Sequence, residues 1–404
     1  MTNCLPTTHH PLTKNLNIDL CDLTALNQQD YVLLGNSDSI SAFHTLIKDT
    51  SAKPPIRTLF SDGNASDTSL AQFDPTSTSV VVTSTSNKVE MLSAIAHIEK
   101  YRILDISAAM LNNWSFYHDA PQIPYIMLFC TNPVDRHPMW SHAFQTWLNE
   151  QGIRLIYRHP LQRVDSNLLA QSEGVVFWGG SISCFDLIKR QLQDLDIPYS
   201  FCECGFFPQA DYMYFDPCGI NVESVLAGDD LAWLPTDYLS ILSQKRQEFF
   251  DPIPAYSELK DYTFIPLQMA KDSNIQSHSR FTQGMQEFID YIENLYPNET
   301  LIFKTHPRDP SHYQLNAKNS SWSNASSQSL IKSAKRVHGI NSTVLFEAAL
   351  FGVEVITEGD SLLVRHQHQY DKLLAAMILR QCNVKKGDFS KAKLTQFSHL
   401  TFED

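Results

Sequence analysis

The sequence contains no long apolar segment. No apolar run reaches the ~18 residues that a membrane-spanning helix requires. The first fifteen residues, MTNCLPTTHHPLTKN, have neither the basic start nor the apolar stretch of a secretory signal. We therefore expect the protein to act in the cytoplasm. Its composition, 43% apolar and 19% charged, is typical of a globular protein.

Basic residues are in the minority, with 31 Lys and Arg against 44 Asp and Glu and a net charge of −13. Binding to a nucleic-acid backbone needs clustered Lys and Arg, so we expect no nucleic-acid partner. The same charge disfavours a purely electrostatic attachment to anionic lipid. An anionic ligand would have to be bound locally, by helix N-termini and a few basic side chains.

Residue patterns typical of metal sites are also missing. Cys202 and Cys204 lack the second ligand pair of a standard zinc site. The eight cysteines lie in apolar neighbourhoods, which favours reduced, buried thiols over a disulfide framework. Asp229 and Asp230 follow a glycine, which favours a solvated turn or a helix cap over a metal ligand. We expect neither a metal nor a cofactor.

Alternating apolar runs and helical patterns predict an α/β fold. Because 404 residues exceed one hydrophobic core, we expect two lobes. We place the N-terminal Rossmann-like lobe at 1–250, a linker at 251–256, the C-terminal Rossmann-like lobe at 257–385 and a tail at 386–404. Two prolines in the linker exclude a continuous helix or a central strand there.

The C-terminal half shows a regular alternation of strands and helices. The predicted strands are 262–267, 301–304, 336–340 and 353–357, the predicted helices include 281–295 and 342–351, and the Ser- and Asn-rich stretch 316–329 is predicted to be a loop. This order requires a parallel sheet with right-handed crossovers. Ligands of such sheets bind at the carboxyl ends of the strands.

Polar residues directly follow three of these strands. The segments are 266–275 (PLQMAKDSNI), 303–308 (FKTHPR) and 339–347 (GINSTVLFE). Each has a purely structural interpretation: Asp272 could cap a helix, His306 could be a hydrogen-bonded residue at a strand exit, and Ser342 is a helix N-cap. An N-cap is also an anion site, because the N–H groups and the helix dipole point outward.

Glu347 is harder to explain structurally, because its neighbours on the predicted helix are nearly all apolar. A carboxylate there must face a cleft or find a partner, since burying an unpaired charge is costly. Because three consecutive strands each end in a polar cluster, we expect these strand ends to define one crevice.

Four segments resemble the bacterial transferases of 3-deoxy-D-manno-octulosonic acid (Kdo) that act in capsule and lipopolysaccharide synthesis, a family related more distantly to bacterial sialyltransferases. The segments are Phe264–Ile275 with His278-Ser279, Lys304–Arg308, Asn341–Ala349, and Cys202–Phe207 with Asp216–Asn221. The likeness covers roughly residues 174–358. Cys204 departs from the family pattern, which usually has an acidic residue at that position.

The resemblance implies a GT-B architecture, in which two Rossmann-like lobes with parallel sheets face across a cleft. It implies that Kdo is moved from CMP-Kdo to a saccharide or lipid-linked acceptor, without a metal. The implied donor-binding residues are Gln268, Lys304, His306, Pro307, Arg308, Asn341, Ser342, Thr343 and Glu347. His306 would contact the donor phosphate, and Glu347 the ribose. Asp272 would attack the anomeric carbon, and Glu203 would move the acceptor's proton.

Two other functions stay open. A sialyltransferase, or a transferase of another nonulosonic acid, would share the CMP-sugar site but invert the anomeric centre directly. A noncatalytic module that binds saccharide or nucleotide in polysaccharide assembly would keep the fold without the chemistry, and Cys204 favours it. The sequence also leaves open the acceptor and any peripheral contact with the inner membrane or assembly machinery.

Overall fold

The computed structural model describes residues 18–27, 29–48, 50–60, 70–84, 88–93, 95–110, 122–130, 138–162, 164–180, 185–269, 275, 278–392 and 394. These residues divide into two compact units. Unit 1 contains the described residues from Cys204 to Asn383, and unit 2 contains those before Cys204 together with those from Val384 onward.

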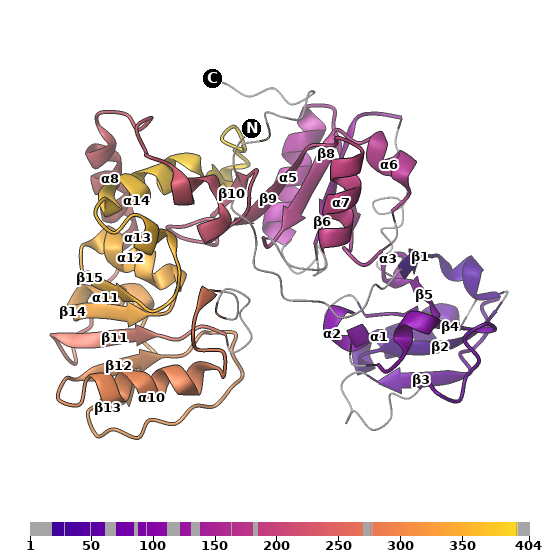
Figure 1. Cartoon of the computed structure of the whole chain (residues 1–404), viewed down its shortest axis with the longest axis horizontal. Helices are drawn as coiled ribbons and strands as arrows, with labels where there is room; N and C mark the ends of the chain where they lie inside the picture. The colour runs from indigo at the N-terminus through magenta and orange to yellow at the C-terminus, as the bar shows by residue number, and fades with distance from the viewer. Residues whose placement is uncertain are drawn as a thin grey trace. The chain divides into compact units, whose positions relative to one another are not determined.

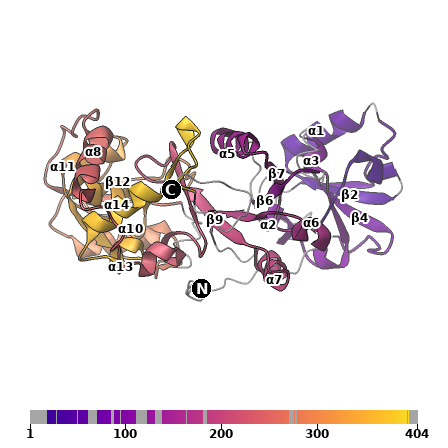
Figure 2. The same cartoon turned by 90° about the horizontal axis from the view of Figure 1, so that it is seen from above.

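The first sheet of unit 2 is parallel, with strand order β1-β5-β4-β2-β3. Its strands are β1 (Ile18–Leu20), β2 (Asp30–Gly35), β3 (Arg57–Phe60), β4 (Thr78–Val82) and β5 (Arg102–Asp105), and the accompanying helices are η1 (Leu23–Asn27), α1 (Ser37–Ile47), α2 (Lys88–Ser93), η3 (Ile98–Lys100) and α3 (Ser107–Met110). Asn36 starts α1 by accepting a hydrogen bond from the Ser39 N–H at 2.8 Å. Helices α1 and α3 lie beside each other (Figure 2).

The second sheet of unit 2 is also parallel, with the order β9-β8-β6-β7. It contains β6 (Tyr125–Phe129), β7 (Arg154–Arg158), β8 (Gly174–Trp178) and β9 (Tyr199–Cys204), and is accompanied by α5 (Pro138–Glu150), α6 (Ser166–Ala170), α7 (Asp186–Asp194) and η8 (Val384–Lys386). Every residue of β6 and β8 is buried. Burial on both faces explains why these strands are continuous apolar runs rather than alternating ones.

A buried hydrogen-bond network around an ion pair links the two sheets of unit 2. The ammonium of Lys88 donates to Oδ2 of Asp105 at 2.6 Å and to Oγ of Ser107 at 2.8 Å. The amide of Gln162, which follows β7, donates to the same carboxylate oxygen at 2.8 Å. Burial opposes ionisation of Asp105, but Lys88 and Ser107 outweigh it and hold the pKa of this carboxyl below its usual value.

Unit 1 contains a parallel sheet with the order β13-β12-β11-β14-β15 (Figure 1). Its strands are β11 (Tyr262–Pro266), β12 (Leu301–Lys304), β13 (Ser320–Trp322), β14 (Ala334–Gly339) and β15 (Glu354–Thr357). Around them lie α8 (Tyr238–Phe250), α10 (Met285–Leu295), α11 (Ser327–Ser333), α12 (Thr343–Phe351), α13 (Leu362–Arg365) and α14 (Tyr370–Arg380). Before α8 come β10 (Tyr212–Asp216), η6 (Asn221–Glu223) and η7 (Val225–Gly228), and β16 (Cys382–Asn383) pairs antiparallel with β10.

These sheets confirm the predicted α/β class and the parallel order of the C-terminal strands. The division of the chain differs from the prediction, because it falls at Cys204 rather than at 251–256. Phe207 and Phe250 share one hydrophobic core with Phe264 of β11, so residues 204–250 belong with the C-terminal sheet. The expected linker is itself tied to α11, since Lys332 donates to the Ile253 carbonyl at 2.8 Å.

The composition of the polar stretch 316–329 predicted a loop, but the structure differs. The stretch contains the edge strand β13 and the start of α11. The buried carboxylate of Glu293 accepts hydrogen bonds from the N–H groups of Asn316 and Ala317 at 3.0 and 3.1 Å, and this fixes the segment that leads into β13.

The cysteines only partly match the expectation. Cys21, Cys130, Cys202, Cys204 and Cys382 are free thiols, whereas Cys218 is disulfide-bonded. Asp229 is not a solvated turn residue either: its side chain is 11% exposed and pairs with the Arg380 guanidinium at 2.7 Å. Across the described ranges, no helix is both long and apolar enough to span a membrane.

Candidate functional site

The three polar segments follow neighbouring strands of one sheet. Strand β11 lies between β12 and β14, and all three run in the same direction (Figure 1). In this register Pro266 lies opposite Lys304, so the segments that follow β11 and β12 start at the same level. The sheet therefore brings Gln268, Lys304 and Asn341 to one edge, as expected for a parallel sheet.

A pair of amide hydrogen bonds links two of these strand ends. Gln268 donates from Nε2 to Oδ1 of Asn341 at 2.9 Å, and its Oε1 accepts the backbone N–H of Asn341 at 3.2 Å. Gln268 is 6% exposed, so these contacts satisfy a buried amide that would otherwise be costly. The Gln268–Asn341 link thus fixes the entrance to α12.

Helix α12 begins at this link. Ser342 is its N-cap, and the Ser342 hydroxyl accepts the Val344 N–H at 3.3 Å. Thr343, in the first turn, is within 3.0 Å of the Gln209 side-chain amide. Gly352 ends the helix with φ of 97°, a left-handed conformation that favours glycine. The first turn of α12 can hold an anion without a basic side chain, because its N–H groups point outward.

Glu347 is buried one turn into α12. It is 9% exposed, and the Gln328 amide of α11 donates to its Oε2 at 3.2 Å. Desolvation raises the pKa of Glu347 to about 7. A carboxylate buried beside an amide, and paired with no cation among the described residues, is suited to accept hydrogen bonds from ligand hydroxyl groups, which would offset its desolvation.

The segment after β12 supplies basic side chains. Lys304 is half-buried, and its burial lowers the pKa of the ammonium. Nδ1 of His306 accepts the Arg308 N–H at 3.2 Å, so the neutral ring carries its proton on Nε2, the form that can donate to a phosphate. Pro307 and Arg308 are exposed.

Neither predicted catalytic carboxylate is placed at this site. Asp272 lies outside the described residues. Glu203 lies near the end of β9 in unit 2, and it is partly exposed. Their roles therefore stay predictions.

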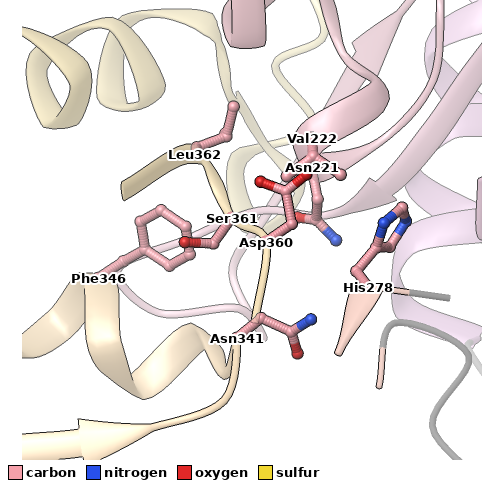
Figure 3. A pocket seen from close by; sticks show the side chains of 8 residues that line it. All are labelled: Asn221, Val222, His278, Asn341, Phe346, Asp360, Ser361 and Leu362. Carbon is pink, nitrogen blue, oxygen red and sulfur yellow. The ribbon is translucent and has the colours of Figure 1, made fainter. Parts of the chain in front are cut away.

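A small, open recess lies beside the N-terminus of α12. It is lined by Asn221, Val222, His278, Asn341, Phe346, Asp360, Ser361 and Leu362 (Figure 3). The side chains of Asn221, His278 and Asn341 surround the same space in this view. Only Asn341 among these residues belongs to the predicted set.

A sequence signal existed for part of this recess. Asp360 and Ser361 closely follow β15, just as the predicted clusters follow β11, β12 and β14. The rule that selected three strand ends would therefore have selected a fourth. Asn221 and His278 lie within the segments that carried the family resemblance, but no role was derived for either residue.

The C-terminal part of the chain matches a known family model. Residues 243–401 match the model described as "Capsule polysaccharide biosynthesis protein". Over this segment the match agrees with the predicted resemblance to proteins of capsule synthesis. It begins within α8 and includes every predicted donor-binding residue as well as Asp272.

A curated relative is "Protein FixF" of Sinorhizobium fredii (strain NBRC 101917 / NGR234), which is 32% identical over 206 residues. The aligned region covers 45% of this chain and 48% of FixF, so the chain spans about half the length of this relative.

Two solved structures of Thermosulfurimonas dismutans KpsC are also similar. The "beta Kdo 2,4 transferase" gives a TM-score of 0.46 at 14% identity and covers 64% of this chain and 91% of its own. The "beta Kdo 2,7 transferase" gives a TM-score of 0.44 at 15% identity and covers 67% and 99%.

Proposed function

We propose that the protein is a glycosyltransferase of surface polysaccharide synthesis that moves Kdo from CMP-Kdo to a saccharide or lipid-linked acceptor, with retention of configuration. The main support is the joining of adjacent strand ends by the Gln268–Asn341 link, next to a capped helix and a buried carboxylate. The family match covers this same region.

In this proposal the first turn of α12 holds the donor phosphate. Ser342 and Thr343 lie at the helix start, where N–H groups and the helix dipole favour an anion. His306 donates from Nε2 to the phosphate, and Lys304 and Arg308 offset the charge that develops on departing CMP. The buried Glu347 carboxylate accepts the ribose hydroxyls.

The chemistry proceeds by two displacements. An oxygen of Asp272 attacks the anomeric carbon of Kdo, and the bond to the phosphate oxygen breaks so that CMP leaves with the electron pair. An acceptor hydroxyl then attacks the same carbon, gives its proton to Glu203 and releases Asp272. Two inversions give net retention. No metal takes part in this scheme. The proposed site of action is the cytoplasm, and the scheme is compatible with peripheral contact between the protein and the inner membrane.

The test is release of CMP from CMP-Kdo and from CMP-sialic acid, offered separately to wild type, to Asp272→Ala and to the control Asp251→Asn. Asp251 is an exposed carboxylate at the end of α8. We expect release from CMP-Kdo by wild type and the control, and a loss of at least about a thousandfold in Asp272→Ala.

Mass spectrometry of denatured protein then tests the mechanism. A Kdo adduct on the peptide that contains Asp272 supports double displacement. Turnover of CMP-sialic acid without an adduct would favour the inverting transferase instead. CMP binding without turnover of either donor would favour a noncatalytic module, and no interaction with either donor would refute the proposed function.

A further inference from the structure

The open recess of Figure 3 is lined by Phe346 of α12, whereas Glu347 of the same helix is not among its lining residues. Phe346 lines the recess, and the next residue, Glu347, contacts Gln328 of α11. Successive helix positions differ by about 100° around the axis, so the two side chains leave the helix in different directions. A ligand whose phosphate lies at Ser342 can therefore extend toward Glu347 with one part and into the recess with the other.

The lining of the recess fits a neutral, hydroxylated group. Polar groups come from Asn221, His278 and Asp360, and the apolar wall comes from Phe346 and Leu362, which are 3% and 2% exposed. Among the eight described lining residues there is no Lys or Arg. A few polar groups set in an apolar wall are typical of a site that orients a small ligand.

The charge of Asp360 is already balanced. Its Oδ2 pairs with the Arg365 guanidinium at 2.6 Å, which leaves lone pairs of Oδ1 to accept from a hydroxyl. This arrangement provides a charge-assisted acceptor without excess negative charge in the recess. It suits a sugar hydroxyl better than a carboxylate or a phosphate.

The recess walls are held in position before any ligand binds. The Asp360 N–H donates to the His278 carbonyl at 2.8 Å, and Arg280 pairs with Glu358 at 2.8 Å. Asn221 is held at φ of 49° by two contacts, because its N–H donates to the Tyr214 hydroxyl at 3.2 Å and its carbonyl accepts from Ser224 at 2.6 Å. Asn tolerates this left-handed conformation better than most residues.

Resting on the proposed function, we propose that this recess binds the hydroxyl-bearing tail of the transferred acidic sugar. Asp360 accepts from a tail hydroxyl, and the Asn221 amide forms a second hydrogen bond. Phosphate and nucleoside bind outside it, at the start of α12 and beside Glu347.

The experiment compares the KM for CMP-Kdo with the Kd for CMP in Asp360→Asn, Asn221→Gly and the control Asp251→Asn. Asn221→Gly removes the amide and keeps the left-handed backbone unstrained. We expect both recess variants to raise KM about tenfold or more while the Kd for CMP stays within about twofold of wild type. The control should leave both constants unchanged.

A donor that lacks the terminal tail hydroxyl provides the matched ligand change. Wild type should lose about tenfold in kcat/KM with this donor, and Asp360→Asn should lose little more than it has already lost. Three results would each overturn the recess assignment while leaving the proposed function standing. They are wild-type KM values in both variants, equal losses of affinity for CMP and for the donor, and full additivity of the losses caused by Asp360→Asn and by the missing tail hydroxyl.

Failure of the proposed function gives a different result. If wild type releases no CMP from CMP-Kdo, the function is refuted, and saturation-transfer NMR with free Kdo then tests the recess directly. Binding that is lost in Asp360→Asn supports the recess, whereas no binding to wild type overturns it.

Discussion

Replacing Glu347 by Gln should stabilise the protein at alkaline pH and weaken donor binding. An ordinary glutamate carboxyl has a pKa of 4.5, and desolvation raises the pKa of Glu347 to about 7 in the fold. The difference, 7 minus 4.5, corresponds to roughly 3 kcal/mol at about 1.4 kcal/mol per pH unit. Ionised Glu347 therefore destabilises the unliganded fold by about this amount.

The sign of the pH dependence follows from proton binding. Between pH 4.5 and about 7 the folded state holds a proton on Glu347 that the unfolded state has lost, so the free energy of unfolding falls as the pH rises through this window. Glu347→Gln removes that dependence and should keep the hydrogen bond from Gln328. We expect the variant to be more stable than wild type by roughly 3 kcal/mol near pH 8, and by less than about 1 kcal/mol near pH 5.

The assay is urea unfolding, monitored by pulsed hydrogen exchange of peptides from α12 because the two units need not unfold together. The control is Glu287→Gln, which changes an exposed glutamate in the first turn of α10. This control should stay within about 0.5 kcal/mol of wild type at both pH values. A Glu347→Gln protein less stable than wild type near pH 8 would refute the reasoning.

The same substitution should act on donor binding in the opposite direction. If the ionised carboxylate accepts the ribose hydroxyls, wild-type affinity for the donor falls as the pH drops below about 7. Glu347→Gln should bind the donor about tenfold more weakly than wild type near pH 8, with a ratio that approaches one near pH 5. Taking the ratio cancels any pH dependence that the two proteins share.

Three further predictions concern the scaffold. Gly359→Ala should destabilise unit 1 by about 1–3 kcal/mol in urea unfolding, because an added Cβ would lie 2.9 Å from Ile340 Cγ2 and 3.0 Å from the His278 carbonyl; an unchanged midpoint would contradict this. Asp105→Asn should lower the free energy of unfolding of unit 2 by about 3–5 kcal/mol, because it leaves the Lys88 ammonium buried without its counter-charge. A thermal midpoint equal to that of wild type would show that the pair does not stabilise the unit. In wild type the stabilisation from the depressed pKa of Asp105 should be lost as the pH falls below the usual range of an aspartate, which acid unfolding of wild type against Asp105→Asn measures.

The C-terminal sheet could be predicted because β11 and β12 are short, almost entirely buried apolar runs, and because strands and helices alternate along this half of the chain. Strands β11, β12, β14 and β15 all lie where this pattern predicted them, to within two residues. Strand β13 could not be found in this way, since its sequence Ser-Ser-Trp is polar and it pairs only at the sheet edge. Edge strands need little burial, so hydrophobicity does not mark them.

The division between the units depends on contacts that are remote in sequence. Phe206 packs against Phe346 with ring centroids 5.3 Å apart, and Arg246 donates to the Leu350 carbonyl at 2.5 Å. No local pattern reports a contact across more than a hundred residues. The prolines after α8 gave a stronger local signal, although the chain continues there within the same unit.

The candidate site was predictable where a strand end supplied its residues. Gln268, Lys304 and Asn341 follow adjacent strands, and a parallel sheet necessarily brings such positions to one edge. Asn221 could not be found by this rule, because it follows β10, which pairs with β16 outside the parallel sheet. The high pKa of Glu347 also depends on burial by the whole unit rather than on its neighbours in sequence.

The most direct test of the account is a crystal structure of the protein with CMP bound. We expect the phosphate at the first turn of α12, within hydrogen-bond distance of Ser342 or Thr343 and of His306, with the ribose hydroxyls on Glu347. CMP bound at another surface, or no binding at millimolar CMP, would contradict it.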